Sequence, residues 1–114
     1  AAAVALGAVV ERGDPRAVAE ALARLNCLEA GTREAGVVAL AVVAEQGDAT
    51  AVAALCACLQ DLDASVRMAS LRAIGQVAST GDALAVAAVQ SLLRDPRHDV
   101  RAVAATALAT LTAS

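Results

Sequence analysis

The chain has 114 residues, which is enough for one continuous hydrophobic core but not for two. It contains no Phe, Tyr or Trp, and its formal net charge is −3. Acidic and basic residues are interspersed, so the clustered cations that bind nucleic acid are missing, and no apolar run approaches the ~18 residues that span a bilayer. The composition therefore argues against nucleic-acid binding and against membrane insertion.

One dipeptide recurs at a fixed interval along the chain. It occurs as Gly13-Asp14, Gly47-Asp48 and Gly81-Asp82, one copy every 34 residues. Apolar positions follow the same interval, and a period of this size is typical of stacked helical repeats. We therefore divide a single domain, 1–114, into repeats at 14–47, 48–81 and 82–114.

The first thirteen residues match the end of a repeat. Leu6 falls in the same column as Leu40, Ile74 and Leu108. Residues 1–13 are therefore predicted to be the last helix of a preceding repeat, and the chain is expected to be a fragment of a longer repeat protein.

Each repeat is predicted to contain two helices. The first begins at about Asp14, Asp48 or Asp82 and ends at about Leu25, Leu59 or Leu93; the second covers Thr32 to Gln46, Ser65 to Thr80 and His98 to Thr112. Apolar residues step by three and four in both, as in Val52, Leu55, Cys56 and Leu59, or in Val66, Ala69, Ala73, Ile74 and Val77. The predicted fold is an all-α solenoid of about three and a half helix-turn-helix repeats, with about seven antiparallel helices.

Glycine, aspartate and proline indicate the helix boundaries. Each recurring Gly is expected where a helix ends and the backbone turns left-handed, and each following Asp is expected to cap the next helix. Pro15 suits a first helical position, where no N–H donor is needed. Gly7 and Gly75 lie inside second helices, where we expect close contact with a neighbouring helix.

The turn between the two helices carries a recognisable motif, Leu-x-Asp followed by Val-Arg. It reads Leu59-Gln60-Asp61 with Val66-Arg67, and then Leu93-Arg94-Asp95 with Val100-Arg101. This turn resembles that of HEAT-like repeats in the armadillo/HEAT α-solenoid superfamily, especially the short phycobilisome-lyase type. Tetratricopeptide and ankyrin repeats fit less well, because their aromatic positions and their Thr-Pro-Leu-His turn are missing.

The resemblance implies that the Asp and Arg of the motif form a ladder between repeats. Asp61, Asp95, Arg67 and Arg101 would then be structural. The first repeat departs from the pattern, since Cys27 replaces the Asp and Thr32 the Val, so Arg33 is expected to have lost its acid. The alternative is an Arg row that binds an acidic partner.

No group of residues predicts catalysis, a metal site or a bound cofactor. The single histidine, His98, is expected in an exposed turn without partners. An odd number of cysteines, Cys27, Cys56 and Cys58, indicates free buried thiols in a reducing, intracellular compartment, with the cytoplasm favoured. The HEAT-like enzyme deoxyhypusine hydroxylase uses His-Glu pairs to hold iron, and this sequence has none.

The solvent side of the second helices is the predicted partner-binding surface. Its composition is mixed, moderately apolar and nearly neutral, which suits a groove that receives a protein segment. An ordinary solvated face remains the alternative. The candidate residues are Glu34, Val38, Val42, Met68, Arg72, Gln76, Thr106 and Thr110.

The sequence favours a non-catalytic scaffold or adaptor for another protein. Two alternatives stay open: a subunit of a bilin-lyase-like or other HEAT-repeat enzyme whose active groups lie outside this segment, and a structural subunit of a large assembly. The two ends, 1–10 and 100–113, are apolar and lack the polar face of a capping repeat. We therefore expect self-association, or packing against neighbouring repeats of the same chain.

Overall fold

A computed structural model describes residues 12–113, which form six α-helices, one short 3₁₀ helix and no strand. The predicted helix over 1–13 lies almost wholly outside the described residues, and Arg12 and Gly13 are in a turn. The elements are α2 (Pro15–Arg24), α3 (Ala30–Val43), α4 (Ala49–Cys58), α5 (Ala64–Val77), α6 (Ala83–Ser91), η1 (Leu92–Arg94) and α7 (His98–Thr112).

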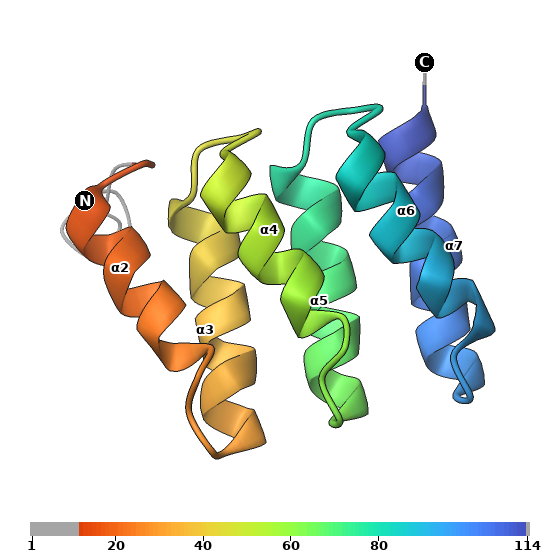
Figure 1. The fold of residues 1–114 in the computed structure, drawn as a ribbon, viewed down its shortest axis with the longest axis horizontal. Helices are drawn as coiled ribbons and strands as arrows, with labels where there is room; N and C mark the ends of the chain where they lie inside the picture. The colour runs from red at the N-terminus through yellow and green to blue at the C-terminus, as the bar shows by residue number, and fades with distance from the viewer. Residues whose placement is uncertain (1–11, 114) are drawn as a thin grey trace, which may run out of the picture.

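The helices form two layers (Figure 1). The first helices of the repeats, α2, α4 and α6, make one layer, and the second helices, α3, α5 and α7, make the other. Each pair is antiparallel, and successive pairs stack side by side in chain order. This arrangement confirms the predicted fold class, an all-α helical-repeat solenoid.

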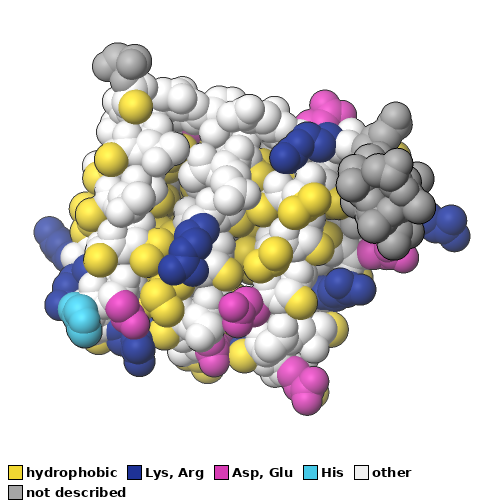
Figure 2. Space-filling model, turned by 180° about the vertical axis from the view of Figure 1, so that it is seen from behind, with side chains coloured by type: hydrophobic (Ala, Val, Ile, Leu, Met, Phe, Trp, Pro, Cys, Tyr) yellow, Lys and Arg dark blue, Asp and Glu magenta, His cyan; other side chains and the backbone are white. Residues whose placement is uncertain are grey.

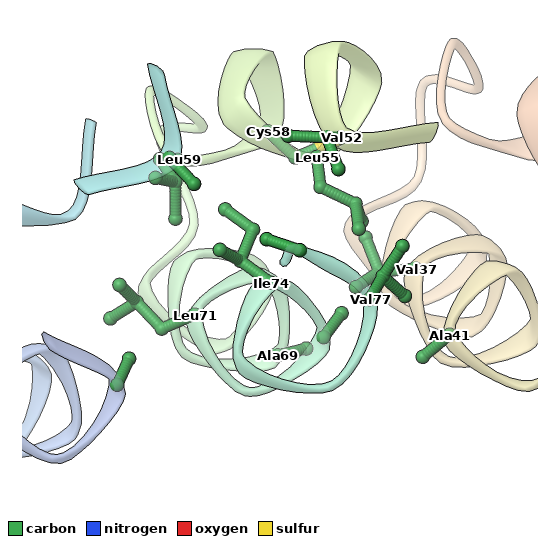
Figure 3. Close-up of a cluster of buried hydrophobic side chains, with 14 of the residues drawn as sticks. Val37, Ala41, Val52, Leu55, Cys58, Leu59, Ala69, Leu71, Ile74 and Val77 are labelled. Carbon is green, nitrogen blue, oxygen red and sulfur yellow. The ribbon is translucent and has the colours of Figure 1, made fainter. Parts of the chain in front are cut away.

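The core lies between the two layers and consists of aliphatic side chains. Leu55 of α4 points toward the layer of second helices, where Val37 of α3 and Ile74 of α5 lie (Figure 3). All three are completely buried. The predicted stripe of α5 is confirmed throughout, whereas Cys56 in the α4 stripe is only partly buried. Small side chains let the two layers pack closely, and many such contacts compensate for the small area that each one buries.

The recurring glycines have the expected backbone conformation but a different position. Gly13, Gly47 and Gly81 have φ values of +83°, +81° and +81°. However, α3 ends at Val43 and α5 at Val77, not at Gln46 and Thr80 as predicted. The helices end early because Ala44 and Ala78 adopt extended conformations, with ψ of 144° and 146°.

Each of these glycines instead binds the end of another helix. The N–H of Gly47, in the loop after α3, donates to the carbonyl of Val77 at the end of α5 (2.6 Å). The N–H of Gly81 donates in the same way to Leu111 of α7 (2.7 Å). A terminal carbonyl has no partner within its own helix, so this bond satisfies it and joins the carboxyl ends of neighbouring second helices.

The aspartates that follow the glycines cap the first helices as predicted. The carboxylate of Asp48 accepts a hydrogen bond from the N–H of Ala51 (2.9 Å), and that of Asp82 accepts one from Ala85 (3.1 Å). Asp14 accepts a longer one from Arg16 (3.4 Å), with Pro15 at the first helical position. In each Gly-Asp dipeptide, the glycine N–H therefore binds a carbonyl at the end of one helix, and the aspartate caps the start of another.

The third repeat differs from the second where its first helix ends. The α-helix ends at Ser91, and the 3₁₀ helix η1 begins with Leu92, whose side chain is buried. Leu93 is 37% exposed, whereas its counterpart Leu59 is 0% exposed. In Figure 3, Leu59 lies beside the following repeat; nothing among the described residues covers Leu93 in this way.

One expectation about glycine is wrong. A Cβ added at Gly75 would have no atom of residues 12–113 within 4 Å apart from the backbone of α5 itself, so no described neighbouring helix requires a glycine there. The close approach is found at Gly36 of α3, where an added Cβ would lie 2.8 Å from the Cβ of Arg24 and 3.0 Å from the carbonyl oxygen of Ala21. Gly36 therefore lets α2 and α3 pack closely; Gly7 lies outside the described residues.

Candidate protein-interaction face

Charged side chains connect the amino ends of the second helices. The Arg33 guanidinium makes two hydrogen bonds to the Asp61 carboxylate in the next repeat, from Nε at 2.7 Å and from Nη2 at 3.0 Å. Its Nη1 donates to the carbonyls of Cys27 and Leu28 in its own turn. The prediction that Arg33 had lost its acid is wrong, because Arg33 pairs with the Asp of the following repeat.

Arg67 repeats this arrangement one step along the stack. Its Nε lies 2.9 Å from Oδ2 of Asp95 in an ion pair that is poorly aligned for a hydrogen bond, and its Nη2 donates to Oδ1 at 3.3 Å. Arg101 donates to the backbone carbonyl of Asp95 (2.6 Å) and forms no ion pair with residues 12–113. Arg33 and Arg67 therefore form structural ion pairs between repeats.

The Arg33–Asp61 pair shifts the acidity of both groups. Hydrogen bonding from Arg33 lowers the pKa of Asp61, and the backbone N–H of Asp63 acts in the same direction. The hydrogen bond to Asp61 also raises the pKa of Arg33. Both residues are mostly buried at this contact, so the pair links adjacent repeats instead of offering a free cation to a partner.

The three cysteines lie in different environments and are all free. Cys58 is buried, Cys56 is partly buried and Cys27 is exposed, so the expectation of three buried thiols is wrong for Cys27. Burial raises the pKa of Cys58, and the nearby charge of Asp61 adds to this. Burial and Asp82 raise the pKa of Cys56. A raised pKa favours the unreactive thiol over the thiolate.

His98 is exposed as the first residue of α7. Beside it, Arg97 pairs with Asp99 at the surface (2.8 Å) and lowers the pKa of Asp99 to about 2. Among residues 12–113, no three His, Cys, Asp or Glu side chains are grouped so as to hold a metal ion.

The outer side of α3, α5 and α7, which Figure 2 shows, carries most of the predicted binding residues. Apolar side chains gather across this face, and acidic side chains lie along its lower edge in that view. We call it the second-helix face. Val38 and Val42, one turn apart on α3, are 55% and 59% exposed. These are large exposed fractions for branched apolar side chains in a chain with so small a core.

Two grooves run side by side along the second-helix face. The Val38 groove lies between α3 and α5 and has a volume of about 290 Å³. It brings together Glu34, Val38, Ala41, Val42, Ala69, Arg72, Ala73 and Gln76. The Gly75 groove lies between α5 and α7 and has a volume of about 310 Å³. Its walls are Leu71, Arg72, Gly75, Gln76, Val103, Thr106, Ala107 and Thr110.

Seven of the eight predicted binding residues line these grooves, and Met68 does not. Met68 is partly buried and packs against the core. Sequence reasoning missed the groove floors, namely the alanines of the Val38 groove and Gly75 itself. The signal for Gly75 was available, since an unexplained helix-interior glycine marks a place where another group can approach the backbone.

A further hollow of about 340 Å³ lies between α2 and α4 and includes Cys58 and Asp61. We assign it no binding role, although it is slightly larger than either groove. The Asp61 carboxylate is already bound by Arg33, and burial raises the pKa of the Cys58 thiol.

The fold and the inter-repeat contacts place the chain among helical-pair repeat proteins. Consecutive antiparallel helix pairs share one core, and equivalent Arg–Asp and Gly–carbonyl contacts link one pair to the next. A family model described as HEAT repeats matches residues 21–109, so the chain belongs to the HEAT-repeat family. No curated protein matches the chain. None of the described helices has the length and apolar character needed to cross a membrane.

Proposed function

We propose that this chain is a non-catalytic protein-interaction scaffold that binds its partner on the second-helix face. The observation that carries the proposal is the pair of adjacent grooves between α3, α5 and α7, with Val38 and Val42 exposed on one wall. HEAT repeats generally mediate interactions between proteins, which supports a binding role.

The grooves suit a protein segment because they combine an apolar floor with a few polar groups. Alanine and valine side chains can be covered by apolar side chains of a partner, and Arg72 and Gln76 can orient it by hydrogen bonding. The opposite layer, formed by α2, α4 and α6, also exposes Leu84. Single exposed apolar residues of that kind are common and need no partner.

The proposal is tested by capturing partners from the native source with the 114-residue chain and identifying them by mass spectrometry. The double variant Val38→Glu/Val42→Glu places two carboxylates on the groove wall and should abolish capture of the specific partner. Leu84→Glu is the matched control, since Leu84 is 58% exposed on the other layer. The proposal is wrong if the double variant captures the same proteins as the unmodified chain, or if only Leu84→Glu loses them.

A further inference from the structure

The Gly75 groove has a single charged residue. Of the eight residues that line it, only Arg72 carries a charge, and none is acidic. Within residues 12–113 the Arg72 guanidinium takes part in no ion pair, unlike Arg33, Arg67 and Arg97. The groove therefore offers one unneutralised cation beside an apolar floor.

The opposite wall of this groove adds no competing donors. The hydroxyl of Thr106 donates to the backbone carbonyl of Ala102, and the hydroxyl of Thr110 donates to the backbone carbonyl of Thr106, both at 3.2 Å. Their protons are used within α7, which leaves methyl groups and acceptor oxygens for a ligand. Outward-directed donors are thus concentrated on α5, at Arg72 and Gln76.

The floor is open where α5 carries Gly75. A glycine inside a helix costs about 1 kcal/mol relative to alanine. Close helix packing explains the cost at Gly36, but among the described residues no side chain and no other helix lies within 4 Å of a Cβ at Gly75. The missing side chain therefore leaves room for a group from outside the chain.

We propose that the Gly75 groove binds an acidic segment of a partner protein, with an Asp or Glu carboxylate on Arg72 and an adjacent apolar side chain over Gly75. Carboxylate and guanidinium can form two parallel hydrogen bonds, which fix the segment's position as well as its charge. This inference rests on the proposed function, because it specifies what kind of segment that face receives.

The wall shared by the two grooves favours a polypeptide over a small apolar acid. Arg72 and Gln76 form a common wall of both grooves, so a ligand that fills both must extend across α5 from one groove to the other. The Val38 groove contains the acidic Glu34, which would repel a carboxylate. The acidic residue of the bound segment therefore lies on the α7 side of Arg72, and apolar residues of the same segment lie on the α3 side.

The test uses the whole 114-residue chain as bait for a display library of random twelve-residue peptides. We expect enriched peptides to contain Asp or Glu next to an aliphatic residue. Gly75→Leu fills the groove and should weaken binding of these peptides at least about tenfold, while Arg72→Glu should shift enrichment toward basic peptides. The matched control is Gly31→Leu, because Gly31 is an exposed α3 glycine at which an added Cβ also meets no side chain and no other helix of residues 12–113 within 4 Å.

Folding of each variant is checked by circular dichroism and thermal unfolding. The inference is overturned if no peptide is enriched, if enriched peptides lack acidic residues, or if Gly75→Leu and Gly31→Leu bind equally well. It is also overturned if dodecanoate, used as a small apolar acid, binds in an Arg72-dependent manner and the peptides do not. Loss of partner capture in Val38→Glu/Val42→Glu without any acidic preference would leave the proposed function standing and reject this inference alone.

Discussion

Arg67 and Arg72 lie five residues apart on α5 and have different surroundings. Arg67 is paired with the buried carboxylate of Asp95, whereas Arg72 is exposed on the second-helix face. The Leu-x-Asp and Val-Arg motif predicted that Arg67 belongs to a structural ladder between repeats, but it did not show that the Arg pairs with the Asp of the following repeat. That direction explains Arg33 as well, whose acid is Asp61 and not a residue of its own repeat.

Replacing Arg67 by alanine should destabilise the fold. Removing one partner of a buried pair leaves Asp95 without its counterion, at a cost of about 3 kcal/mol in the free energy of unfolding. Urea denaturation followed by circular dichroism measures this. The control Arg72→Ala should stay within about 0.5 kcal/mol of the unmodified chain. Equal stability of the two variants would contradict the structural role of Arg67.

Asp61 should make stability depend on pH in the acidic range. Its folded-state pKa is lowered, so the stabilisation is present above the unfolded pKa of about 3.9 and is lost as pH falls through the lower folded value. Urea midpoints measured from neutral pH down to about pH 3 should fall less steeply for Asp61→Asn than for the unmodified chain.

Asp99 provides the comparison for this experiment. Its pKa is lowered to about 2, but its pair with Arg97 is at the surface, where water and salt screen it. Asp99→Asn should therefore change the acid dependence less than Asp61→Asn does, and added salt should reduce its effect. The assignment to Asp61 is wrong if Asp61→Asn loses stability with acid as steeply as the unmodified chain.

At the scale of elements, the second helices are held at both ends. Gly47 and Gly81 bind the carboxyl ends of α5 and α7, and the Arg–Asp pairs join the amino ends. The period and the Gly-Asp dipeptide predicted the order and type of the helices. They could not predict that α3 and α5 end early, because a hydrogen bond to another repeat replaces the last helical turn.

The same substitution at two glycines should have opposite effects. Gly81 has φ of +81° and Gly75 is helical, and at both sites an added Cβ would meet only adjacent backbone within 4 Å in the described part of the chain. Gly81→Ala should destabilise the fold by about 1–2 kcal/mol through backbone strain alone. Gly75→Ala should stabilise it by up to about 1 kcal/mol through helix propensity.

Thermal unfolding of both variants in parallel measures these effects. If Gly75→Ala were destabilised, this glycine would be required for folding. Its presence would then not indicate that a ligand occupies the groove. A neutral Gly81→Ala would mean that the left-handed turn after α5 costs an alanine nothing.

At the scale of the whole molecule, the last described repeat exposes surface that inner repeats bury. Leu59, Leu71 and Ile74 are completely buried, whereas their counterparts Leu93 and Ala105 are exposed and Leu108 is partly buried. The apolar sequence of 100–113 predicted such a face. We expect the 114-residue chain to associate with itself or with further repeats through it.

This association should be visible by sedimentation velocity as an average mass that rises with concentration. The double variant Leu93→Glu/Ala105→Glu should reduce it by charging the exposed face, while Leu84→Glu should leave it unchanged. A monomer at all concentrations would contradict the expectation. An association that only Leu84→Glu disrupts would instead move the contact to the layer of first helices.

The sequence by itself determined the repeat period, the two helices of each repeat, the aspartate caps and most of the residues on the second-helix face. These depend on local patterns of three to four residues and on a period that repetition makes easy to detect. Only the tertiary structure decided which Asp pairs with Arg33, which carbonyl accepts the N–H of Gly47, and that no described helix packs closely against Gly75. Each of these depends on the distance between helices that are remote in sequence, and no local pattern encodes that distance.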